Sequence, residues 1–185
     1  NKVKSSRVSR VGGVFGGGIR LISAALDDKT VVFATHNRLH MVDTDGMQKT
    51  MQFETDDEIS ALCISPVDPT LCVVGTNNAK IICVNLQTFA QIASSSAVGY
   101  TRDSDAKKYD YHIILFPVTH LNISRKDGRT IASCSVNNSY RVWDLSVDKS
   151  DLTLKGNPCS PLNNDFYTNV AFSPTGGHYL SLNFY

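Results

Sequence analysis

The side chains that could bind a metal or act as nucleophiles are scattered along this chain, without the spacing that such sites require. The histidines are His36, His40, His112, His120 and His178, and the cysteines are Cys63, Cys72, Cys83, Cys134 and Cys159. None of the histidines forms a zinc-ligand spacing with another histidine, a cysteine or an acid. G-x-S-x-G, H-E-x-x-H and Gly-Lys-Ser/Thr motifs do not occur. The sequence therefore predicts no catalytic residue, no metal site, no cofactor and no small-molecule substrate, and it favours a protein that is not an enzyme.

The positions of the cysteines are typical of buried, packed side chains and not of disulfides or metal ligands. Their number is odd and none lies two residues from another, so neither a disulfide framework nor a zinc site is indicated. Four of them fall inside apolar stretches that we predict to be strands, where a free cysteine packs as a small hydrophobic side chain. A reducing compartment, the cytosol or the nucleus, is the plainer interpretation.

Residues 1–18 form a basic and then glycine-rich N-terminal segment. The basic side chains, with no acid among the first ten residues, are Lys2, Lys4, Arg7 and Arg10. One interpretation is an arm that contacts RNA phosphates or an acidic partner, and the other, which we favour, is a solvated linker. The glycines of 11–18 are followed by no Lys-Ser/Thr pair, so we interpret them as the lead into the first folded repeat.

The stretch from His120 to Leu145 shows the elements that would position any functional side chain. Leu121 and Ile123 alternate with polar residues, which is the period of a half-buried strand. The turn residues Lys126–Arg129 follow, with an Asp and a Gly that favour tight turns. A second short strand, a turn at Asn137–Ser139 and a third strand complete the stretch. It closes with the chain's single Trp in the letters VWDL.

The same register recurs along the chain. Ser124, at the end of the first strand of this stretch, precedes Asp144 by 20 residues, and we find the same offset twice upstream. The residues that define the predicted structural repeat are Ser23, Asp43, Ser65, Asn85, Ser124, Trp143, Asp144 and Ser173. Independent apolar runs would not keep such a register, so the repeat predicts equivalent antiparallel strands, among them Val31–Ala34, Leu71–Val74 and Ile131–Ser135.

Three short antiparallel strands that close on Val-Trp-Asp-Leu resemble a WD repeat, one blade of a β-propeller. The resemblance implies an all-β fold over 19–185, an incomplete WD-repeat β-propeller of three blades plus half of a fourth. A closed propeller of seven blades needs about 300 residues. We therefore expect the chain to be part of a longer protein or to be closed by another chain.

One interval between the repeats is too long. Asp43 and Asn85 lie 42 residues apart, whereas Asn85 and Asp144 lie 59 apart. The excess falls in Ser94–Tyr111, which is rich in serine and in charges of both signs. We predict an insertion between blades, at about 94–111, that lies on the surface.

The repeats depart from the hydrogen-bonded network that WD blades commonly carry, which joins a His, a turn Asp, a strand Ser or Thr and the Trp. Val42 and Val84 stand where the Trp would be, and the third repeat has Asn137–Asn138 where the turn Asp is expected. We therefore expect stability to come more from packed apolar columns than from buried polar networks.

Composition excludes several classes of protein. With 42% hydrophobic and 19% charged residues the chain is globular, and a net charge of +1 provides no broad field for nucleic acid. The chain contains no run of 18 apolar residues, so no membrane span is predicted. The polar first ten residues do not resemble a signal peptide.

Within the WD-repeat family the order of motifs is more specific. Glycines precede the first repeat, which ends MVDTDG, the acidic FETDDEISAL leads into ISP, and Pro117–Val118 precedes YRVWDL. This order is similar to the transducin-beta-like WD-repeat subunits of the small-subunit processome. The resemblance implies a nucleolar, non-catalytic scaffold in pre-ribosomal RNA processing, bound to other WD-repeat subunits of a large ribonucleoprotein assembly. The alternative is a generic WD-repeat adaptor in a chromatin, signalling or trafficking complex, including a cytoplasmic one.

Overall fold

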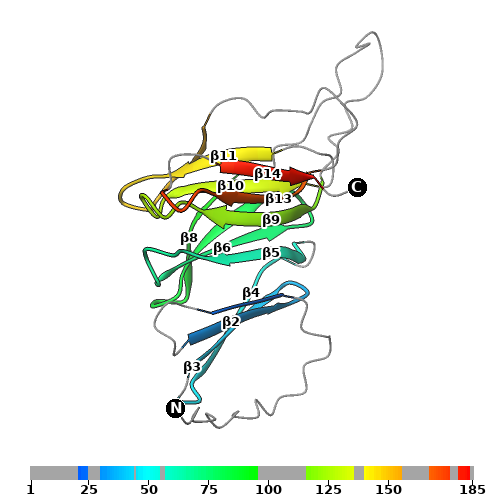
Figure 1. The fold of residues 1–185 in the computed structure, drawn as a ribbon. Coiled ribbons are helices and arrows are strands. Elements are labelled where there is room, and N and C mark those ends of the chain that lie inside the picture. Colours follow the sequence, from blue (N-terminus) through cyan, green and yellow to red (C-terminus); the bar gives the residue numbers. More distant parts are fainter. Residues whose placement is uncertain are drawn as a thin grey trace, which may run out of the picture.

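Every regular element in the described part of the chain is a β-strand, and the strands form four antiparallel sheets in chain order (Figure 1). The computed structural model describes residues 21–24, 30–43, 45–54, 57–95, 116–135, 140–155, 167–175 and 179–183. The first two sheets contain β1 (Leu21–Ala24), β2 (Thr30–Thr35), β3 (Arg38–Asp43), β4 (Gln48–Gln52), β5 (Ile59–Ile64), β6 (Leu71–Thr76), β7 (Ile81–Asn85) and β8 (Ala90–Ser94). The other two contain β9 (Val118–Ile123), β10 (Thr130–Ser135), β11 (Tyr140–Leu145), β12 (Leu152–Leu154), β13 (Tyr167–Phe172) and β14 (Tyr179–Asn183).

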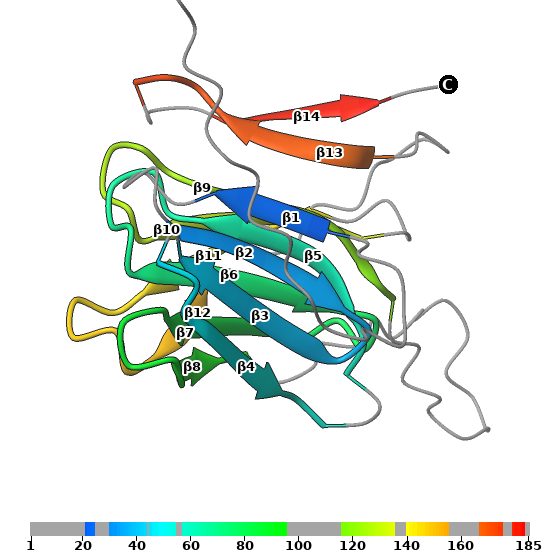
Figure 2. The ribbon, with the colours of Figure 1, turned by 90° about the horizontal axis from the view of Figure 1, so that it is seen from below.

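The predicted repeat of strands is confirmed. Three sheets have four strands and the fourth has two, each strand pairing with the next along the chain. The stretches predicted as equivalent lie in β2, β6 and β10, the second strand of each four-stranded sheet. The sheets follow one another as layers, and β1 lies beside β5, β5 beside β9, and β9 beside β13 (Figures 1 and 2). In these residues no helix is long and apolar enough to cross a membrane.

Side chains on both faces of a strand hold the layers together, because each face packs against a different neighbouring sheet. All six residues of β6 are buried, and successive residues face opposite sides of a strand. Cys72 and Val74 pack with the first sheet, whereas Leu71 and Val73 pack with the third. This is why β6 is a continuous apolar run without polar alternation.

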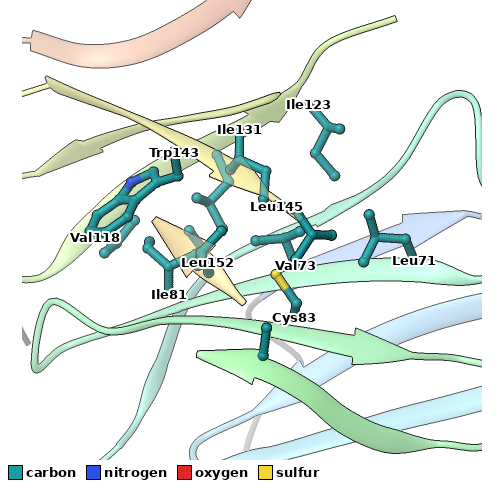
Figure 3. Close-up of a cluster of buried hydrophobic side chains, with 13 residues drawn as sticks. Leu71, Val73, Ile81, Cys83, Val118, Ile123, Ile131, Trp143, Leu145 and Leu152 are labelled. Atoms are coloured by element: carbon teal, nitrogen blue, oxygen red, sulfur yellow. The ribbon is translucent and has the colours of Figure 1, made fainter. Parts of the chain in front are cut away.

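The largest of the three inter-sheet clusters lies between the second and third sheets (Figure 3). Leu145 of β11 lies beside Val73 of the second sheet there, and Trp143 of β11 lies beside Val118 of β9. Each large side chain buried in this way stabilises the fold by about 1.5–3 kcal/mol. The expectation that apolar columns carry the stability is supported by this cluster and by the one between the first two sheets.

The structure describes only the first two residues of the predicted insertion, and both belong to the second sheet. Ser94 is the last residue of β8 and pairs with Ile82, and the backbone N–H of Ser95 donates to the carbonyl of Ile81. The Ser95 hydroxyl also accepts from the N–H of Ile81, at 2.9 Å. These two serines continue the sheet because their backbones still find partners in β7. Residues 96–111 of the predicted insertion, like the segment 1–18, lie outside the described residues.

Candidate interaction surface

Ser65 and Ser124 occupy equivalent places, one residue beyond β5 and β9. Each pairs with the start of the next strand, because the N–H of Ser65 donates to Leu71 O and that of Ser124 to Thr130 O. The Ser65 hydroxyl accepts from Asp68 N at 3.2 Å, and the Ser124 hydroxyl from Lys126 N at 3.2 Å. The repeated serine therefore has a structural role: it organises the turn between the first two strands of a blade.

An aspartate completes each of these turns. Asp127 accepts from the backbone N–H groups of Arg129 and Thr130, both at 2.9 Å, and from the Thr130 hydroxyl at 2.7 Å. Burial opposes the ionisation of Asp127, but these hydrogen bonds outweigh it and lower the pKa of the carboxyl to about 2. Asp68 makes the corresponding bonds to Thr70 and also an ion pair with Lys149, which ties the turn of the second sheet to the third.

Ser23 does not occupy the equivalent position, so the repeat assignment needs a correction there. The acid positions do match in register, since Asp43 pairs with Thr30 and Asp144 with Thr130. Ser23, however, lies within β1 opposite Val32, two residues before the position that matches Ser124. The reason is that the β1–β2 connection and the β2–β3 turn are each one residue shorter than their counterparts in the second sheet. The constant offset of 20 is therefore a coincidence in the first repeat.

Ser173 follows β13, and its hydroxyl lies 3.1 Å from that of Thr175.

Asp43 and Asn85 end the third strands of their sheets, opposite Thr30 and Leu71. The Asp43 carboxylate accepts from Asp45 N and Met47 N, and the Asn85 side chain accepts from the N–H groups of Gln87 and Thr88. A side-chain oxygen at this position accepts hydrogen bonds from the backbone of the turn that leads into the outermost strand. Both Asp and Asn provide such an oxygen.

Trp143 is buried between the second and third sheets, with 2% of its surface exposed. Its indole N–H donates to the hydroxyl of Ser133 at 2.9 Å. The Trp–Ser part of the WD network is therefore present in the third repeat, which the sequence analysis did not identify. The turn expected to hold Asn137–Asn138 lies outside the described residues.

The histidine and cysteine side chains of the sheets serve packing. His40 is buried and bridges the hydroxyls of Thr35 and Thr50 at 2.8 and 3.0 Å, and burial followed by the charge of Arg38 lowers its pKa. Burial raises the pKa of Cys63 to about 11 and of Cys83 to about 12, so these thiols stay protonated at neutral pH. Among the described residues, no group of three or more His, Cys, Asp or Glu side chains is placed to hold a metal ion.

A polar network that the sequence analysis missed joins the first two sheets. Asp57 is buried in the connection between them, and its carboxylate accepts from the Lys80 ammonium at 2.7 Å and from the Asn78 amide at 3.3 Å. Lys80 also reaches the Glu54 carboxylate at 3.2 Å. The bond to Asp57 raises the pKa of Lys80 against the opposing effect of burial. The acidic stretch at 54–58 and the later NNAK, which ends at Lys80, are the sequence features that could have indicated this network.

Beside this network lies a groove of about 440 Å³ between the outermost strands β4 and β8. Met51, Phe53 and the buried Ile82 supply its apolar surface. Gln52 and Gln91 also line it, as do Glu54, Asp57 and Lys80, which are joined by ion pairs. We call this the β4–β8 groove. It combines apolar contact area with amide and carboxylate groups, as binding sites commonly do.

Solved structures resemble this arrangement, although no protein-family profile and no curated protein sequence matches the chain. The C-terminal WD40 domain of Sif2 matches with a TM-score of 0.67 over 90% of this chain, at 16% identity. The fold is that of a WD40 β-propeller. Three WD40 blades and two strands of a further one are present in the described residues, as the sequence analysis predicted.

Two further structures support the same WD40 fold. A chain of the crystal structure of the mitotic checkpoint complex matches with a TM-score of 0.65 over 87% of this chain, at 18% identity. The structure of U3-55K matches with a TM-score of 0.62 over 82%, at 14% identity. This chain spans 43–44% of the length of the three matching chains. At such identities the likeness shows the fold alone.

Proposed function

We propose that this protein is a non-catalytic scaffold in pre-ribosomal RNA processing and assembly of the small ribosomal subunit. The observation that carries the proposal is the order of motifs, from MVDTDG through FETDDEISAL to Pro117–Val118 and YRVWDL. That order is similar to the transducin-beta-like WD-repeat subunits of the small-subunit processome. The WD40 fold supports the scaffold role, because stacked rigid sheets present their turns and outer strands to partners.

The partners in this proposal are other WD-repeat subunits of a large ribonucleoprotein assembly in the nucleolus. The candidates for RNA contact are the N-terminal basic side chains, for which the solvated linker favoured above is the alternative, and they lie outside the described residues. They are Lys2, Lys4, Arg7 and Arg10. The net charge of the chain is only +1, so phosphate contact depends on such a local cluster and not on a general field.

Purification of the tagged protein from its own cells tests the assignment. Sequencing of the bound RNA and mass spectrometry of the bound proteins should recover small nucleolar RNA together with other WD-repeat proteins. Recovery of a chromatin, signalling or trafficking complex without small nucleolar RNA would instead identify a generic WD-repeat adaptor.

The basic arm is tested separately with purified protein and a labelled single-stranded RNA. Replacement of its four basic residues by alanine should weaken binding and reduce the dependence of affinity on salt, since each phosphate contact releases counterions. The matched control replaces four exposed basic residues of the sheets and turns, Arg38, Arg125, Lys126 and Lys155. An equal loss in both variants would show that the arm has no particular role.

A further inference from the structure

The described charged residues that line the β4–β8 groove carry an excess of negative charge. Lys80 is the single cation among the described residues that line it, and Asp57 and Glu54 both bind its ammonium group, so two carboxylates face one cation there. The Glu54 side chain is 81% exposed, whereas that of Asp57 is only 4% exposed. A ligand cation would therefore meet the Glu54 carboxylate at the rim of the groove.

The apolar surface lies next to this charge. Ile82 is 3% exposed, and Met51 and Phe53 pack partly against the cluster between the first two sheets. A volume of about 440 Å³ lies within the 300–1,000 Å³ usual for ligand sites. The site thus offers an apolar contact and an anionic contact close together.

The position of the groove favours an extended chain as its occupant. β4 and β8 are the outermost strands of their sheets as described, so each has an edge without a neighbouring strand of its own sheet. An extended peptide can use such edges for backbone hydrogen bonds, while adjacent side chains fill pockets. The amides of the lining residues Gln52 and Gln91 add donors and acceptors. RNA fits poorly, because its phosphates would meet the exposed carboxylate of Glu54.

We propose that the β4–β8 groove binds an extended segment of another protein that carries a Lys or Arg next to an apolar side chain. The apolar side chain packs on Met51, Phe53 and Ile82, and the cation pairs with Glu54. Arginine suits this place especially, because its planar guanidinium matches a carboxylate with two hydrogen bonds. This inference deepens the proposed scaffold role, and its test uses purified protein alone, so it does not depend on which assembly the protein joins.

The experiment selects from a phage-displayed library of random heptapeptides against the full chain. The enriched peptides should place Lys or Arg within two residues of Leu, Ile, Met or Phe. The best of them, made synthetically with a fluorescent label, should bind the purified protein and lose affinity as salt increases.

Charge reversal then locates the binding site. Glu54→Lys should weaken peptide binding about tenfold or more, equivalent to about 1.4 kcal/mol. Asp45→Lys makes the same charge change at the exposed β3–β4 turn, outside the groove, and should leave binding within about twofold. Gln91→Trp should also weaken binding, because the larger side chain enters the groove from an exposed position. Unfolding midpoints of all variants show that each one remains folded.

Three results would overturn the inference. These are a selection that yields no basic–apolar motif, a selected peptide whose affinity Glu54→Lys does not change, and displacement of the peptide by a 12-nucleotide oligouridine. The last would identify a nucleic-acid surface instead.

Discussion

Trp143 shows how a residue that is often found at interfaces can instead be part of a core. Its ring packs among side chains of the second and third sheets, and its N–H is bound by the Ser133 hydroxyl. With 2% of its surface exposed, it cannot act as an exposed contact for a partner. Along β11, Trp143 alternates with the half-buried Val142 and Asp144.

Truncation of this residue should therefore affect folding before binding. Trp143→Ala should lower the free energy of unfolding by about 3–5 kcal/mol, as for other large buried aromatic residues. Trp143→Phe keeps most of the packing but leaves the Ser133 hydroxyl unpaired, which costs about 1–3 kcal/mol. Denaturant unfolding curves measure both. An unchanged midpoint for Trp143→Ala, with partner binding lost in a pull-down of folded protein, would contradict this assignment.

The lowered pKa of Asp127 predicts that the free energy of unfolding depends on pH. The hydrogen bonds of its turn lower its pKa from 3.8 to about 2, so the folded state favours the carboxylate. Its contribution is therefore fully present above about pH 4 and is lost as the pH falls toward 2. Asp127→Ala should also remove hydrogen bonds and destabilise the protein by about 1 kcal/mol near neutral pH.

The control for this prediction is Asp127→Asn. The amide oxygen can still accept from the N–H groups of Arg129 and Thr130, but it does not titrate. Unfolding midpoints measured from pH 5 to pH 2 should fall less steeply for Asp127→Asn than for the wild type. Equal slopes would show that Asp127 does not titrate with a lowered pKa in the folded protein.

At the scale of elements, the second and third sheets can pack closely because the residues are small where β6 approaches β9. A Cβ atom on Gly75 of β6 would lie 2.6 Å from Val118 Cγ1 of β9 and 3.3 Å from the Cβ of Ala61. Such distances are too short for carbon atoms. Glycine at this position therefore allows the second and third sheets to pack against each other.

Gly75→Ala should force the two sheets apart and lower the free energy of unfolding by about 1–3 kcal/mol, the usual effect of an overpacked core. Val118→Gly removes both Val118 atoms that an added methyl group would meet, Cγ1 at 2.6 Å and Cβ at 2.7 Å. In a double-mutant cycle the two changes should therefore cost less together than the sum of their separate effects. Additive costs would indicate that the sheets adjust without meeting Val118.

At the scale of the whole molecule, the sheets are joined mainly through apolar clusters between successive blades, with polar ties at their ends. Lys149 reaches Asp68 across two sheets, and Lys80 reaches Glu54 across another pair. Glu54 is largely exposed, and a solvent-exposed ion pair such as Lys80–Glu54 contributes little, about 0–1 kcal/mol. The layers are therefore stabilised chiefly by burial, and the ion pairs help to set how the blade ends meet.

The segment 96–111 gives a prediction that rests on the sequence alone. Its serines and mixed charges indicate a surface excursion between blades, so trypsin should cleave near Arg102, Lys107 or Lys108 before it cleaves any sheet. Mass spectrometry of early digestion products measures the order of cleavage. Protection of these bonds while a strand such as β7 is cut would show that the segment is packed.

The sequence by itself determined the class of fold and most of the strands. Alternation, apolar runs and turn residues are local features, so β2, β6 and β10 could be located without knowledge of their neighbours. The strand that holds Trp143 was located in the same way, and alternation along it fixes which residues share its face.

Only the tertiary structure decided which side chains of different repeats meet. Lys80 and Asp57 lie 23 residues apart and come together because a turn of one sheet packs against the connection that precedes it. The place of Ser23 depended on turn lengths, since one missing residue in each of two turns shifts the register without altering the local pattern. The β4–β8 groove likewise requires the distance between two outer strands, which packing between blades sets and no single stretch of sequence contains.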